Sequence, residues 1–168
     1  RMQSLTQVCY LMEESIILDA TDWRLLALLQ ADAGLTNQAL AEAAHVSPAT
    51  ALRRVKRLVD TGVIERITAL LAPRFAGRGL TALCEVSLDR QGAEHLDAFE
   101  ARAVAEPAVQ QCWRVSPGPD FVLVAWAVDM PAFHALTQRL FTADANVRNV
   151  KTFFGIKRAN FEPRVPGP

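Results

Sequence analysis

The sequence has few of the features that mark secreted, metal-binding or disulfide-stabilised proteins. Its three cysteines, an odd and widely spaced set, fit neither a disulfide scaffold nor a Cys-x-x-Cys metal site. Its three histidines stand apart from other ligand-type residues, so no metal site and no cofactor is expected. The cysteines are Cys9, Cys84 and Cys112, which we interpret as free thiols in a reducing cytoplasm.

Long apolar runs and an excess of one charge are also missing. No stretch reaches the roughly 18 apolar residues of a membrane span, and no secretory signal is evident, so we expect no membrane partner and a cytoplasmic location. Lys plus Arg and Asp plus Glu number 18 each, giving a net charge of zero. This balance excludes a strongly basic nucleic-acid coat protein and an acidic tail, but it allows a local basic patch.

What remains is a globular composition, with 51% hydrophobic and 21% charged residues over 168 positions. This length suits one domain or two small ones. Residues 1–17 match no clear period and are expected to form an N-terminal extension.

Capping signals divide residues 18–72 into three short helices. Asp19 caps a helix over about 20–31, and Thr36 caps one over about 37–44. Ser47 and Pro48 open a third over about 48–60, since serine at the cap with proline in the first turn is a specific start signal. The β-branched run at 63–71 predicts a strand that forms one side of a small wing.

The second half alternates strands with helices. After a linker at 73–80, the patterns predict strands at 80–88, 109–115, 121–128 and 147–157 and helices at 92–105 and 131–143. The order βαββαβ is ferredoxin-like, so residues 81–163 are expected to form this domain, followed by a tail at 164–168. The fold class is thus α+β, a winged helix-turn-helix followed by a ferredoxin-like sandwich.

Such a sheet carries its two helices on one face and leaves the other bare. The strands are too apolar for a wet face, which predicts that a second subunit covers it. The residues behind this expectation are Cys112, Val122, Val124, Trp126 and Phe154.

The third helix carries the pattern that points to a function. Leu52, Val55 and Val59 fall at i, i+3 and i+7 and are expected to pack on Leu40, Ala44 and Trp23. A different face is basic and polar, carrying Thr50, Arg53, Arg54 and Arg57 with Lys56 at its margin. Guanidinium groups suit phosphates and guanine edges, so two short helices with this second face predict double-stranded DNA as the partner. Helix caps with free amides add phosphate contacts, and the full candidate set is Thr36, Ser47, Pro48, Thr50, Arg53, Arg54, Lys56 and Arg57.

These residues resemble the Lrp/AsnC, or feast/famine, family of transcription regulators over about residues 16–163. The likeness rests on the runs Leu18–Asp22 and Ser47–Ile64, which includes Arg53-Arg54-Val55-Lys56-Arg57-Leu58. The resemblance implies a homodimer paired through its sheets, with further assembly to tetramers or octamers, and an amino-acid effector bound between dimers. The family often has glycine in the turn where this chain has His45, a residue that tolerates a left-handed backbone better than most.

The resemblance also implies an effector site after the second strand of the C-terminal domain. The family loop commonly reads Gly-x-x-Asp, and here it is Pro117-Gly118-Pro119-Asp120. The candidate effector residues are Ser116, Gly118, Asp120 and Thr152. The alternative interpretation of residues 117–120 is a rigid hairpin turn.

Two other functions stay open from the sequence. Sirohaem decarboxylases resemble the family in both domains, but their histidine- and tyrosine-rich region corresponds here to Gln110–Arg114, and no catalytic set is evident. We therefore expect no enzyme. The second alternative is a helix-turn-helix that binds protein instead of DNA.

Overall fold

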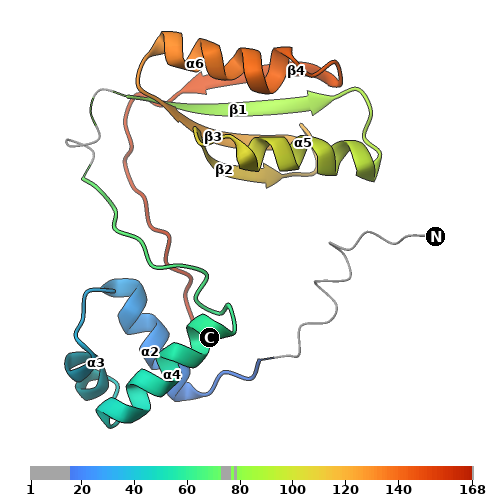
Figure 1. Ribbon diagram of the computed structural model, residues 1–168. Coiled ribbons are helices and arrows are strands. Elements are labelled where there is room, and N and C mark those ends of the chain that lie inside the picture. Colours follow the sequence, from blue (N-terminus) through green and yellow to red (C-terminus); the bar gives the residue numbers. More distant parts are fainter. Residues whose placement is uncertain (1–15, 73–76, 78, 168) are drawn as a thin grey trace. The chain divides into compact units, whose positions relative to one another are not determined.

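The computed structural model describes residues 16–72, 77 and 79–167, and these divide into two compact units. Among the described residues, the first unit contains 16–69 together with 162–167, and the second lies within Leu70–Phe161 (Figure 1). Most of the predicted extension, with Cys9, and most of the predicted linker lie outside the described residues. The predicted tail at 164–168 falls, up to Gly167, in the first unit by its contacts.

The three predicted helices of the first unit are confirmed. They are α2 (Ala20–Ala31), α3 (Asn37–Ala43) and α4 (Pro48–Asp60). Each begins where the sequence places a cap, because the side chains of Asp19, Thr36 and Ser47 accept hydrogen bonds from first-turn amides. The three helices pack on a small core made by Leu25, Leu40, Ala41, Ala44 and Ala51.

The packing side of α4 differs from the predicted one. Leu52 and Val59 are 61% and 45% exposed, whereas Ala51 and Leu58 are fully buried and Val55 is partly buried. The helix is turned by about one residue relative to the expectation. Both sets have helical spacing, so periodicity does not choose between them, and the small side chain of Ala51 fits the close helix contact.

The strand predicted at 63–71 is absent from the described chain. Ile64 donates its N–H to the carbonyl of Leu58, but residues 65–71 are exposed and have no ladder partner. A β-branched run favours extended backbone, yet a strand exists only where another strand supplies its hydrogen bonds. The prediction was therefore wrong for the single chain.

The second unit has the predicted βαββαβ order. Its elements are β1 (Leu80–Leu88), α5 (Ala93–Ala105), β2 (Val109–Arg114), β3 (Phe121–Ala127), α6 (Met130–Thr137), η2 (Gln138–Thr142) and β4 (Val147–Phe154). The sheet order is β2-β3-β1-β4 with every neighbouring pair antiparallel, which confirms the ferredoxin-like arrangement. The last helix is shorter than predicted because a π-helical turn continues it, and the last strand ends three residues early.

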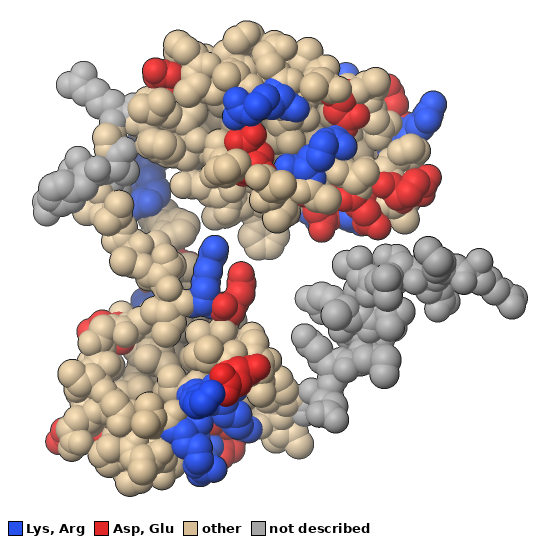
Figure 2. All heavy atoms as spheres, viewed as in Figure 1, with Lys and Arg blue, Asp and Glu red and all other residues tan. Residues whose placement is uncertain are grey.

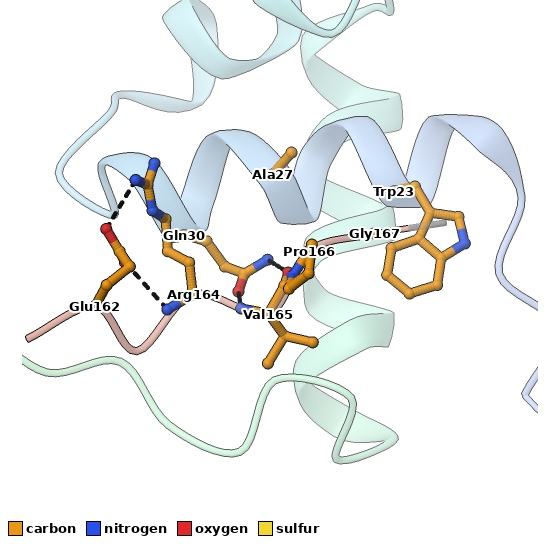
Figure 3. A pocket seen from close by; sticks show the side chains of 8 residues that line it. All are labelled: Trp23, Ala27, Gln30, Glu162, Arg164, Val165, Pro166 and Gly167. Atoms are coloured by element: carbon orange, nitrogen blue, oxygen red, sulfur yellow. Dashed lines mark hydrogen bonds and ion pairs between the residues drawn. The ribbon is translucent and has the colours of Figure 1, made fainter.

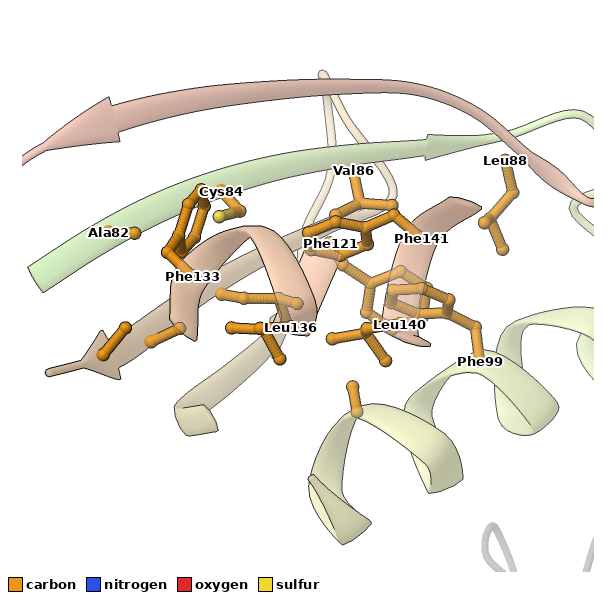
Figure 4. Close-up of a cluster of buried hydrophobic side chains, with 14 residues drawn as sticks. Ala82, Cys84, Val86, Leu88, Phe99, Phe121, Phe133, Leu136, Leu140 and Phe141 are labelled. Atoms are coloured by element: carbon orange, nitrogen blue, oxygen red, sulfur yellow. The ribbon is translucent and has the colours of Figure 1, made fainter. Parts of the chain in front are cut away.

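Both helices cover the same face of this sheet. Alternate β1 residues from Ala82 to Leu88 point into a core with Phe99 of α5 and Phe133 and Leu136 of α6 (Figure 4). Cys112 and Phe154 belong to this covered side, since Cys112 lies opposite Leu123 and Phe154 stacks edge-on against Phe133. The prediction that these two residues lie on the bare face was wrong.

The other face of the sheet carries no described helix and mixes apolar side chains with polar ones, among them Glu85 opposite Lys151. Val122, Val124 and Trp126 lie there as expected, in register with alternate residues of β1. Leu83, Trp113 and Phe153 share that face and are 40%, 59% and 49% exposed. Among the described helices none is long and apolar enough to cross a membrane.

Candidate nucleic-acid interface

The helix-turn-helix is built by a short turn between α3 and α4. His45 has a φ of 57°, in the left-handed region, and its neighbour Val46 donates to the carbonyl of Ala41 at 2.9 Å. The left-handed backbone expected at this turn is therefore confirmed, and histidine occupies a position at which glycine would carry less strain. Asn37, which the sequence analysis did not single out, ties the two helices together through Nδ2 to the carbonyl of Pro48 at 2.9 Å.

The start of α4 presents polar groups to solvent. Ser47 Oγ accepts from the Thr50 N–H at 3.2 Å and lies 2.9 Å from Thr50 Oγ1. Ser47, Pro48 and Thr36 are exposed, and Thr50 is half-buried. These four candidates therefore lie at the accessible ends of α3 and α4, where free amides and hydroxyls suit a phosphate.

The basic side chains of α4 divide into two groups. Arg53 is exposed, and within the described residues no carboxylate pairs with it. Lys56 is also exposed and pairs one turn along with Asp60 at 2.6 Å. Figure 2 shows Lys and Arg side chains gathered on this unit with acidic side chains beside them.

Arg54 and Arg57 form the second group, which faces the start of α2. Arg54 Nη1 lies 2.8 Å from Asp19 Oδ2 and 2.9 Å from Asp22 Oδ1. Arg57 Nη2 lies 2.5 Å from Asp22 Oδ2. Arg54 is 24% exposed in its side chain, and its buried Nε has no hydrogen-bond partner in the described chain.

Asp22 is the centre of this ion-pair cluster of Asp19, Asp22, Arg54 and Arg57. It is 1% exposed, and burial acts to raise its pKa, but hydrogen bonds from the Asp19 amide and from both arginines outweigh burial and lower the pKa below its usual value. Hydrogen bonds to Asp19 and Asp22 raise the pKa of Arg54. The cluster links the start of α2 to α4 through three ion pairs.

The spacing of charged residues in the sequence is consistent with this cluster, although the sequence analysis did not predict it. Asp19 and Asp22 lie three residues apart, as do Arg54 and Arg57, so each pair occupies one side of a helix. On facing helices the two acids and two arginines form three ion pairs, because Arg54 contacts both acids. We read the acids only as a cap and a first-turn charge, which they also are.

The candidate effector residues are only partly brought together. Ser116 and Gly118 are exposed in the β2–β3 hairpin, where Gly118 has a φ of 127° that favours glycine. Asp120 ends the same hairpin, and its Oδ2 accepts from the Leu88 N–H at 2.7 Å. Thr152 lies across β1 on β4, opposite Cys84 and on the helix-covered face, with Oγ1 3.6 Å from Cys84 Sγ.

The described cysteines, Cys84 and Cys112, are free thiols of the ferredoxin-like unit. Burial raises the pKa of the Cys84 and Cys112 thiols, which makes both weak nucleophiles, and neither is in a disulfide. Within residues 16–72, 77 and 79–167, no cluster of three or more histidine, cysteine or acidic side chains could hold a metal ion.

Comparison with known proteins gives the family of both units. Residues 18–65 match the winged helix-turn-helix DNA-binding model, and residues 81–165 match the Lrp/AsnC ligand-binding domain. The chain is 38% identical over 141 residues to the leucine-responsive regulatory protein of Rhizobium meliloti, covering 84% of this chain and 90% of that protein. It is 31% identical over 150 residues to the DNA-binding transcriptional activator DecR of Escherichia coli, covering 89% and 99%.

Solved structures agree. The transcriptional regulator NMB0573 of Neisseria meningitidis, determined in complex with L-Met, superposes with a TM-score of 0.79 at 31% identity, covering 89% of this chain and 97% of that one. Escherichia coli AsnC shares the fold, with a TM-score of 0.75 at 16% identity over 90% of this chain and 99% of that one. With a DNA-binding helix-turn-helix and a ligand-binding domain in the same order, this chain belongs to the Lrp/AsnC family of transcriptional regulators.

Proposed function

We propose that this cytoplasmic regulator reads DNA with the exposed face of α4, pairs through the open face of its sheet, responds to an amino acid and catalyses no reaction. The observation that carries the DNA-reading part is the exposed guanidinium of Arg53, which pairs with no acid among the described residues, on a helix opened by Ser47 and Pro48. A guanidinium without an internal acid partner can donate two hydrogen bonds to guanine or pair with phosphate.

Within this proposal the basic residues have different roles. Arg53 and Lys56 contact DNA, with Thr36, Ser47, Pro48 and Thr50 contacting the backbone at the helix ends. Arg54 and Arg57 act mainly through the ion-pair cluster, because their donors are directed to Asp19 and Asp22. The proposed set of DNA-contacting residues is therefore smaller than the candidate set from the sequence.

The test is DNA binding by Arg53→Ala, measured by fluorescence anisotropy on the region upstream of the protein's own gene. We expect a loss of about 1–3 kcal/mol in specific binding and an unchanged melting temperature, because Arg53 makes no internal ion pair in the described chain. Arg148→Ala is the matched control, since Arg148 is an exposed arginine on β4. Equal affinity of Arg53→Ala and the native protein, at both low and high salt, would remove α4 from the interface.

The sheet face supports pairing of two copies. Leu83, Trp113 and Phe153 expose apolar side chains on one side of a four-stranded sheet, and these side chains are stabilised when a second sheet covers them. The proposed partner is therefore a second copy of the chain, with assembly to tetramers or octamers as a further step.

The effector part of the proposal rests on the β2–β3 hairpin. Asp120 Oδ1 accepts no hydrogen bond from the described residues, so it is free to receive an α-ammonium group. The N. meningitidis relative was solved with L-Met, and an amino acid is the chemistry we propose here. Thr152 lies on another strand, so its part in the same site requires a ligand that reaches beyond the hairpin or a second copy.

Thermal-shift measurements with each common amino acid test the effector. We expect one or a few of them to raise the melting temperature in proportion to binding, and Asp120→Asn to remove that rise while keeping an oxygen that can accept from Leu88 N–H. Thr152→Val serves as the comparison that separates the hairpin from β4. If no amino acid stabilises the native protein, the sensing part of the proposal fails while the DNA-binding part stands.

A further inference from the structure

The outer side of α2 is in contact with the C-terminal end of the chain. A shallow hollow on this helix is lined by Trp23, Ala27 and Gln30 on one side and by residues of the segment 162–167 on the other (Figure 3). The helix and the segment belong to the same compact unit, although the whole ferredoxin-like unit separates them in the sequence.

Gln30 holds the segment by its main chain. Gln30 Nε2 donates to the carbonyl of Val165 at 3.1 Å, and the Val165 N–H donates to Gln30 Oε1 at 2.7 Å. One side-chain amide therefore satisfies both backbone groups of one residue, as a neighbouring strand would. This pairing recognises an extended backbone and depends little on the side chain, and Val165 is indeed 68% exposed.

Close contact at Gly167 adds selectivity for small residues. A Cβ atom placed on Gly167 would lie 3.2 Å from Cε3 of Trp23, so even an alanine there requires the indole ring to shift by a few tenths of an ångström. Pro166 precedes it and restricts the local backbone. Arg164 pairs with Glu162 within the segment, through both its N–H and its guanidinium.

We infer that the outer face of α2 is a docking surface for this chain's own C-terminal segment, Glu162–Gly167, and that the segment acts as a strap. Residues 155–161 connect the end of β4 to the docked segment and contain no helix or strand. The chain thus passes between the two units a second time, and the strap joins the last strand of the ligand-binding domain to the DNA-binding unit. Because the segment is already tethered, its effective concentration at α2 is high even though it buries little surface.

The inference rests on α2 and the segment alone, so its test uses no DNA. We would record ¹⁵N NMR spectra of the full chain, of a chain ending at Phe161 and of Gln30→Ala. Truncation is expected to shift the Trp23 indole signal, and a synthetic peptide of residues 160–168 is expected to restore it. In Gln30→Ala the amide exchange of Val165 should be roughly three- to tenfold faster, as for the loss of one exposed hydrogen bond.

Gln38→Ala is the matched control, because Gln38 is an exposed glutamine on α3 and does not line the hollow that holds the segment. It should leave the Trp23 signal and the Val165 exchange unchanged. Identical Trp23 signals in the full and truncated chains would overturn the docking. A mixture of labelled truncated chains and unlabelled full chains tests which copy supplies the segment. If the Trp23 signal of the labelled truncated chains is restored in this mixture, the segment docks on a neighbouring copy and not on its own chain.

Discussion

Among the described residues, Asp22 is the buried charged side chain at the centre of the ion-pair cluster. It is only 1% exposed, and it accepts hydrogen bonds from two guanidinium groups and one backbone amide. A buried carboxylate of this kind costs solvation, and it is tolerated because the arginines restore its interactions. Its loss would leave Arg54 with Asp19 alone as a counter-charge, and Arg57 without a carboxylate partner among the described residues.

We predict that Asp22→Asn lowers the free energy of unfolding of the DNA-binding unit by about 3 kcal/mol, at the lower end for breaking a buried ion pair because both arginines are partly exposed. Urea unfolding followed by circular dichroism measures this. Asp32→Asn is the control, since Asp32 is an exposed acid at the other end of α2. A change of less than about 0.5 kcal/mol, the scale of an ordinary surface substitution, would mean that the cluster contributes little.

The same residue predicts a pH dependence. The folded-state pKa of Asp22 lies below its unfolded value, so its contribution to stability is complete above about pH 4 and is lost as the pH falls through the lowered folded-state pKa. Asp19, whose pKa is lowered by the Asp22 amide and by Arg54, acts in the same direction. The melting temperature of the native protein should therefore fall more steeply below pH 4 than that of Asp22→Asn.

The sequence predicted the residue types of the site but not how they are divided. It identified an arginine-rich helix and its capped start, since both follow from spacing along one element. It did not separate Arg53, which faces water, from Arg54, which faces Asp22, because helical periodicity is the same for a solvated face and for a face turned to a charged neighbour. That distinction depends on where α2 lies, which is a tertiary property.

Among the elements, the turn between α3 and α4 stores backbone strain in one residue. His45 has a φ of 57°, and an L-residue pays roughly 1–2 kcal/mol in that region. We predict that His45→Gly stabilises the unit by about 0.5–1 kcal/mol, because relief of the strain exceeds the extra entropy of glycine in the unfolded chain. His45→Ala retains the strain and should not stabilise. Thermal unfolding of the two variants decides the matter, and equal melting temperatures would indicate that the turn is unstrained.

Element boundaries followed the local signals closely, and the failures have tertiary causes. β1 has the predicted bounds because a nine-residue segment with apolar residues at alternate positions lies centrally in the sheet with partners on both sides. The run at 63–71 has similar composition but no partner strand in the described chain, so it stays extended and exposed. In the same way, periodicity placed α4 correctly and assigned its buried side to the wrong neighbour, Leu52 in place of Ala51.

At the scale of the whole molecule, the open sheet face exposes apolar side chains that the single chain does not cover. We predict that Leu83→Glu, on this face, converts the proposed dimer to a monomer by multi-angle light scattering, since the new carboxylate would be buried beside Val124 and Phe153 with no cation opposite it, whereas Glu85 lies opposite Lys151. Val104→Glu is the control, because Val104 is 68% exposed on α5, on the helical side. An unchanged mass for Leu83→Glu would place the pairing surface elsewhere.

The path of the chain has a practical consequence for proteolysis. One crossing from the DNA-binding unit to the ferredoxin-like unit is the stretch around residues 70–79, and the other is residues 155–161 with the segment that returns to α2. A protease that cuts the first crossing therefore leaves two pieces that still share a clasp of two hydrogen bonds at Gln30. Whether the nicked halves elute together or apart then reports directly on how firmly that clasp is closed.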